Sequence, residues 1–142
     1  MTLEEWKSLF EQAMLAKIAD IKSFRKLKIL DVGVFPWNAS IEISVFYVGD
    51  DSFDSCFEGD VASWPGYDFS GGAEGRWPEA ESLCEAMNKD YETDTTSKGK
   101  YFQAVADVMK QSAIIDALNT KLLDDNFRVT ILDPDDPDTD YM

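Results

Sequence analysis

Two apolar, β-branched segments separated by a short turn place the strongest constraint on the fold. The first occupies residues 27–35 and stops at Pro36. The second, residues 41–48, begins with alternating apolar and polar side chains and ends at Gly49-Asp50. Such segments favour strands, and the turn residues 37–40 between them favour an antiparallel pair. The sequence therefore predicts an early β-hairpin with one buried face.

Three helices are predicted around this hairpin. Thr2 stands three residues before Glu5, the spacing of a capping box, and apolar residues then recur every three or four positions. Pro78 suits the first turn of a second helix that runs to about Tyr91. A third helix is expected over residues 101–123, where apolar side chains again gather on one face.

The remaining segments complete the predicted order α-β-β-(β)-α-α-β. Residues 49–76 are rich in glycine and acids and are expected to form a long loop that accommodates a short third strand near Phe53–Phe57. Residues 127–132 predict a last strand able to join the hairpin, and 133–142 a flexible acidic tail. We expect residues 1–142 to form one α+β domain, a small antiparallel or mixed sheet packed by about three helices.

The strong negative charge of the chain restricts the class of partner that it can bind. The chain has 13 basic and 28 acidic side chains, a formal charge of −15. Residues 1–30 hold six basic and four acidic side chains, so the excess negative charge lies after them. Such a field repels nucleic acids and anionic membranes and attracts basic proteins. We expect a basic protein partner, with no nucleic acid and no membrane.

The chain lacks the residues on which most catalytic and metal sites depend. It has no histidine, and its two cysteines, Cys56 and Cys84, stand 28 positions apart. We expect both to be buried, reduced thiols, and we predict no catalytic residues, no metal and no cofactor. The chain begins without a secretory signal and has no apolar run of membrane-spanning length, so a cytoplasmic location is expected.

Two loops resemble ligand-binding motifs only superficially. The glycines of residues 71–75 lack the Gly-Lys-Ser/Thr ending of a phosphate-binding loop. The acidic run at 133–140 lacks the central glycine and closing glutamate of a calcium loop.

A carbohydrate-active enzyme stays open as an alternative, because such enzymes need only two carboxyl groups near aromatic platforms. Its candidate residues are Asp60, Asp68 and Glu74 with Trp64, Tyr67 and Trp77.

Taken along nearly its full length, the chain resembles the immunity proteins of bacterial polymorphic-toxin and contact-dependent growth inhibition systems. The resemblance is one of size, charge and element order. It is carried by the helix from Thr2, the strand 41–48 leading into Gly49-Asp50-Asp51, the helix 101–123 and the closing segment 127–135. It implies a small antitoxin that binds and neutralises a cognate toxin domain, often a basic nuclease.

The expected partner-binding surface lies in the long acidic loop and the turn before Pro78. Aromatic side chains concentrate binding energy at interfaces, and surrounding charge selects the partner. The predicted partner-binding residues are Asp50, Asp51, Asp54, Glu58, Asp60, Trp64, Tyr67, Asp68, Glu74 and Trp77. An acidic adaptor or regulatory domain without a toxin partner is the second alternative.

Overall fold

The computed structural model describes residues 1–71 and 77–142 and has the predicted α+β architecture. Its main sheet is mixed, in the order β2-β1-β3: the central strand pairs antiparallel with β2 and parallel with β3. The register sets Val32 opposite Ile43 and Gly33 opposite Glu42. These strands are β1 (Leu27–Phe35), β2 (Ser40–Tyr47) and β3 (Leu123–Thr130).

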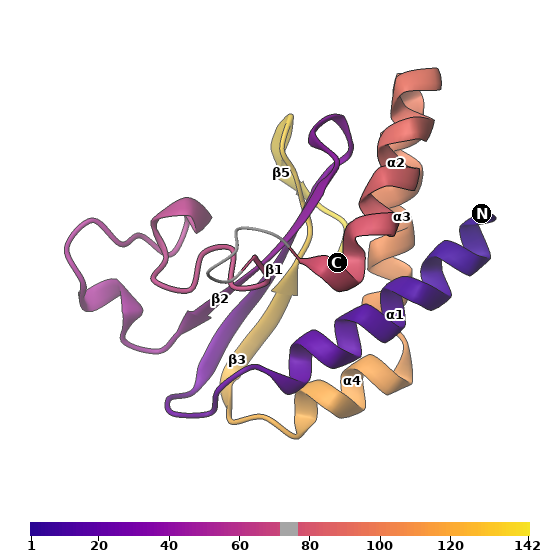
Figure 1. Ribbon diagram of the computed structural model, residues 1–142. Helices are drawn as coiled ribbons and strands as arrows, with labels where there is room; N and C mark the ends of the chain where they lie inside the picture. The colour runs from indigo at the N-terminus through magenta and orange to yellow at the C-terminus, as the bar shows by residue number, and fades with distance from the viewer. Residues whose placement is uncertain (72–76) are drawn as a thin grey trace.

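Helices cover one face of this sheet (Figure 1). The first begins with the predicted capping box, in which the Thr2 hydroxyl accepts a 3.1 Å hydrogen bond from the Glu5 amide. It lies against the third and fourth helices. The helices are α1 (Leu3–Ala19), α2 (Glu81–Thr93), α3 (Lys98–Met109) and α4 (Ser112–Asn119). None of the helices in the described residues is both long and apolar enough to cross a membrane.

The main core lies between the helices and the sheet. Alternate residues of the central strand, Val32 and Val34 among them, point toward the helices and are fully buried. Trp6 of α1 packs on Tyr101 with ring centroids 5.0 Å apart. Its indole nitrogen donates a 2.9 Å hydrogen bond to the Leu83 carbonyl, which fastens α1 to α2. These contacts leave the opposite face of the sheet free to carry other structures.

A lobe formed by residues 49–71 covers part of that opposite face and extends away from the helices (Figure 1). The predicted short strand near Phe53–Phe57 is wrong, because this segment folds into turns. Two short 3-10 turns, Asp50–Ser52 and Val61–Ser63, lie within the lobe. Further 3-10 turns lie at Pro36–Asn38, Pro78–Ala80 and Thr95–Ser97.

The helix predicted over residues 101–123 is in fact two helices. The α3 helix starts earlier, at Lys98, and ends at Met109, and Gln111 is extended with ψ of 145°. This break changes the chain direction (Figure 1), so that Ile114 and Leu118 of α4 are buried in the main core.

The end of the chain is also more ordered than predicted. The last strand of the main sheet begins at Leu123, which pairs with Leu27, and ends at Thr130. The expected flexible tail instead contains a two-stranded sheet of β4 (Leu132–Asp133) and β5 (Asp136–Asp140). It is secured by a 3.0 Å hydrogen bond from the Ile131 amide to Asp140 and by the packing of Tyr141 on Phe102.

Candidate protein-binding surface

The lobe, residues 49–71, begins at an ion pair whose carboxylate is buried. Gly49 adopts a φ of +96°, which turns the chain out of β2. Asp50, only 1% exposed, accepts a 2.7 Å hydrogen bond from Arg25 and a 2.8 Å one from the Tyr47 amide. Arg25 also donates to the Val48 carbonyl at 3.2 Å. The Asp50 carboxylate therefore organises the base of the lobe.

A small second core holds the middle of the lobe against the sheet. Trp64 packs on Phe46 of β2 with ring centroids 5.2 Å apart, and Cys56 is buried beside them. The Trp64 indole nitrogen donates to the carbonyls of Phe57 and Glu58, each at 3.1 Å. One buried side chain thus fixes the backbone that carries the tip of the lobe.

The end of the lobe returns along the edge of β2. Gly66 pairs with Val45, and a Cβ at Gly66 would lie 2.5 Å from the Val45 carbonyl oxygen, so only glycine fits this approach. The Ser44 hydroxyl accepts a 2.9 Å hydrogen bond from the Asp68 amide. The outer edge of β2 is therefore partly covered, which hinders pairing with strands of other chains.

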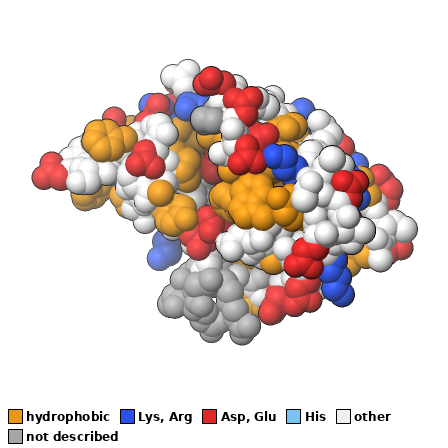
Figure 2. Space-filling model, turned by 90° about the horizontal axis from the view of Figure 1, so that it is seen from above, with side chains coloured by type: hydrophobic (Ala, Val, Ile, Leu, Met, Phe, Trp, Pro, Cys, Tyr) orange, Lys and Arg blue, Asp and Glu red, His pale blue; other side chains and the backbone are white. Residues whose placement is uncertain are grey.

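The outward side of the lobe carries exposed aromatic rings among carboxylates. Phe53 is 55% exposed and Phe57 65% exposed. Asp51, Asp54 and Asp60 are exposed in the same segment. Figure 2 shows hydrophobic side chains next to acidic ones on the lobe, at the left of the view. An apolar ring held in water on a fixed backbone is costly to the free protein and useful at an interface.

The structure divides the ten predicted partner-binding residues into groups. Asp51, Asp54, Asp60 and Tyr67 are exposed, whereas Asp50, Trp64 and Trp77 are buried and serve the interior. Trp77 lies in the main core near Phe10. We therefore leave these three buried residues out of the contact surface.

The other three predicted residues are held differently. Glu58 lies in ion pairs with Lys28 of β1 and Arg128 of β3. Asp68 is half-buried and accepts hydrogen bonds from the Ser70 hydroxyl and the Gly71 amide. Glu74 lies outside the described residues. Glu58 and Asp68 thus serve mainly to stabilise the lobe and contribute less to its exposed surface.

Phe53 and Phe57 stand outside the ten predicted partner-binding residues, although they belong to the same acidic segment. In the sequence, each is an aromatic residue inside an acid-rich turn segment that has no helical or strand periodicity, and this is the feature that indicates a binding residue. Trp64 sits in the same kind of segment and is 4% exposed. The pattern alone does not separate exposed rings from the ring that anchors them.

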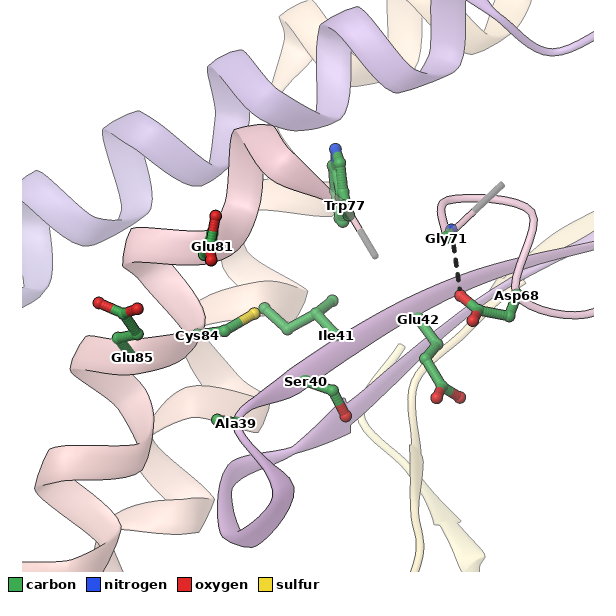
Figure 3. Close-up of a pocket in the computed structure, with 10 residues that line it drawn as sticks. All are labelled: Ala39, Ser40, Ile41, Glu42, Asp68, Gly71, Trp77, Glu81, Cys84 and Glu85. Carbon is green, nitrogen blue, oxygen red and sulfur yellow. Dashed lines mark hydrogen bonds between the residues drawn. The ribbon is translucent and has the colours of Figure 1, made fainter. Parts of the chain in front are cut away.

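A hollow of about 320 Å³ lies between the β2 edge and α2 (Figure 3). Glu81 and Glu85 extend from α2, and Glu42 and Asp68 come from β2 and the lobe. The Cys84 sulfur points to Ile41 at its wall (Figure 3). Burial raises the pKa of the Cys84 thiol to about 11, so at neutral pH this thiol is protonated and a poor nucleophile.

A second hollow, of about 220 Å³, opens on the outer face of the sheet, where the lobe meets β1 and β2. Asp31, 5% exposed, lines it and accepts a 2.6 Å hydrogen bond from Thr130. Burial raises the pKa of Asp31 to about 6. Glu42 lines the same hollow and accepts a 3.1 Å hydrogen bond from the Tyr67 hydroxyl. Burial raises its pKa as well.

The described part of the chain offers little for metal or thiol chemistry. Within residues 1–71 and 77–142, no three histidine, cysteine or acidic side chains are grouped so as to hold a metal ion. Cys56 and Cys84 are both free and buried, as predicted.

Comparison of the chain with models of known families, with curated proteins and with solved structures gives no match. Function must therefore be inferred from the chemistry of the surface itself. That surface combines exposed rings, exposed acids and a backbone that buried contacts tie to the sheet.

Proposed function

We propose that this chain is an immunity protein that binds a basic toxin domain and blocks its active or substrate-binding site. The observation that carries the proposal is the exposure of Phe53 and Phe57 on a lobe that buried contacts hold in place. Exposed aromatic rings are the typical anchors of protein interfaces. Their acidic neighbours, Asp51, Asp54 and Asp60, fit a basic partner.

The contacts that tie the lobe to the sheet support a binding role. Ordering a loop at the moment of association costs free energy that is lost from the affinity. Here the Arg25–Asp50 pair and the buried Trp64 tie the loop to the sheet in the free protein. A lobe fixed in this way favours tight binding by a small surface.

The charge of the chain supports the nuclease as the class of toxin. A nuclease binds phosphates with lysine and arginine side chains, and carboxylates placed on those side chains exclude the nucleic acid. The formal charge of −15 speeds the encounter of such partners and disfavours nucleic-acid and membrane partners of the chain itself. Inhibition of this kind would take place in the bacterial cytoplasm, where a nuclease meets its substrate.

The carbohydrate-active alternative loses support from the buried tryptophans. Sugar rings need exposed aromatic platforms, and of the three candidates only Tyr67 is exposed, at 44%, whereas Trp64 is 4% and Trp77 6% exposed. The adaptor alternative uses the same lobe and differs only in the partner, so the identity of the partner separates it from the immunity role.

The test is co-expression of the chain with the protein encoded by the adjacent reading frame. We expect that protein to arrest growth alone, and the chain to restore growth and to co-purify with it. Phe57→Ser should abolish rescue, whereas Ile115→Ser, at an exposed apolar residue of α4, should not. An adjacent protein that is harmless, or that the chain neither binds nor neutralises, would contradict the proposed function.

A further inference from the structure

The outer-face hollow holds a carboxylate that lacks a counter-charge. Asp31 is 5% exposed, and Thr130 is its sole hydrogen-bond partner within the part of the chain that the structure describes. No lysine or arginine of that part lies within ion-pair distance of it. The two charged groups that act on it, Asp140 and Glu42, carry charge of the same sign. A buried carboxylate in such surroundings is unfavourable unless a cation joins it.

The hollow of about 220 Å³ provides the space for that cation. Gly33 faces the hollow between Asp31 and Phe35 on β1, opposite Glu42 on β2. A Cβ at Gly33 would lie 2.8 Å from the Phe35 ring, so the absence of a side chain lets this ring fold back along the wall. The hollow is thus a preformed space with two carboxylates and aromatic sides.

The walls favour an organic cation over a metal ion. Calcium and magnesium require six or more oxygen ligands, whereas this hollow offers two carboxylates among mainly apolar groups, such as Phe35, Tyr67 and Pro134. A guanidinium group binds carboxylates through its planar fork of donors and stacks on aromatic rings, and its alkyl stem suits an apolar entrance. An arginine side chain combines these properties.

We infer that the outer-face hollow receives an arginine side chain of the partner protein, with Asp31 and Glu42 as its anionic ligands. This inference rests on the proposed function, because it names the group of the partner that the chain recognises. It adds a second contact beside the exposed rings of the lobe, since Val61, Ala62 and Tyr67 of the lobe also line the hollow.

The test uses an acetylated, amidated Gly-Arg-Gly tripeptide as the probe, with NMR detection of backbone amides. Amide signals around the hollow, such as those of Gly33, Ser44 and Leu132, should shift and saturate. A tripeptide with citrulline, which has the shape of arginine without its charge, should not produce these shifts. Equal shifts with both peptides, or shifts spread evenly over the acidic surface, would overturn the inference.

Charge-neutralising variants make the test specific. Asp31→Asn keeps an acceptor for Thr130 and should weaken arginine binding by about tenfold or more. Glu42→Gln, at the rim, provides a second variant and should weaken binding less. Asp116→Asn, on the exposed surface of α4, makes the same change in net charge and should have little effect. Unchanged binding by both Asp31→Asn and Glu42→Gln would contradict the assignment.

The two proposals fail in different ways. If the arginine tripeptide does not bind, while the partner domain is still captured and neutralised, the assignment of the hollow is wrong and the immunity role stands. If no partner domain is captured, the immunity role is wrong, whatever the peptide does.

Discussion

Arg25 pairs with the buried carboxylate of Asp50, with 2.7 Å between Arg25 Nη2 and Asp50 Oδ1, and this pair closes the base of the lobe. Arg25 precedes β1, whereas Asp50 follows β2, so the pair ties both ends of the hairpin to the start of the lobe. The opposite oxygen of Asp50 is used by the Tyr47 amide. The placement of the exposed phenylalanines depends on this junction.

Removing the Arg25 charge should destabilise the fold. Arg25→Gln leaves the Asp50 carboxylate, 1% exposed, without its cation, and we expect a loss of about 1–3 kcal/mol in the free energy of unfolding. Lys22→Gln makes the same charge change at an exposed neighbouring position and should cost much less. Urea denaturation of both variants measures the difference. Equal stabilities would show that the pair is not structural.

The Trp64 indole nitrogen should control the local stability of the lobe. Trp64→Phe keeps a ring beside Phe46 and removes the donor to the carbonyls of Phe57 and Glu58. We expect faster hydrogen exchange at the amides of residues 53–64 and little change in the helices. Trp37→Phe, at a ring that is 39% exposed, is the control. A uniform change over the whole chain would argue against a local role.

The ionisation of Asp31 should make stability depend on pH. Its pKa is raised by burial to about 6 from 3.8, with Glu42 and Asp140 acting in the same direction against the hydrogen bond from Thr130. The folded state thus keeps a proton that the unfolded state loses. The stabilising contribution is complete below about pH 4 and is lost as pH rises through about 6.

Asp31→Asn should therefore be more stable than the wild type at pH 7, by about 1–3 kcal/mol, and should lack this pH dependence. Asp116→Asn is the control for net charge. Thermal unfolding between pH 4 and pH 8 measures both variants. A variant that is less stable than the wild type at pH 7 would mean that the charged carboxylate is needed by the fold itself.

Sequence-based prediction worked where local chemistry decides the structure. The Thr2–Glu5 capping box and the hairpin of β1 and β2 are confirmed, because caps, alternation and turn residues act over a few positions. The split between α3 and α4 was missed. No proline or glycine marks Lys110 and Gln111, and the two helices on either side of them both lie against α1, a long-range contact.

The candidate site was only partly predictable for a similar reason. The composition of the sequence located the acidic segment. It did not show that Trp64 is buried and Phe57 exposed, because the burial of Trp64 depends on contacts with β2, which is distant in the sequence. Asp31 carried no signal as a site residue, because an acid within an apolar strand becomes notable only when its neighbours across the sheet are known. Long-range contacts therefore decide which acids and rings face the partner.

The exposed carboxylates of the lobe should govern the rate of association. Combined replacement of Asp51, Asp54 and Asp60 by Asn should slow association with the toxin domain and reduce its salt dependence. Replacement of Glu11 and Glu92 by Gln and Asp116 by Asn removes the same charge elsewhere and should slow it less. Stopped-flow measurements from about 50 to 500 mM salt separate these outcomes, since added salt screens exposed charges. If both sets of substitutions slowed association equally, the overall charge of the chain, and not the lobe, would set the association rate.

The most direct measurement is the affinity of the toxin domain for the wild type, Phe57→Ala and Ile115→Ala, by titration calorimetry. Both side chains are large, apolar and exposed, 65% for Phe57 and 45% for Ile115, but only Phe57 belongs to the lobe. We predict a loss of about thirtyfold or more for Phe57→Ala and nearly wild-type affinity for Ile115→Ala. Unchanged affinity of the Phe57→Ala variant would contradict the lobe as the binding surface.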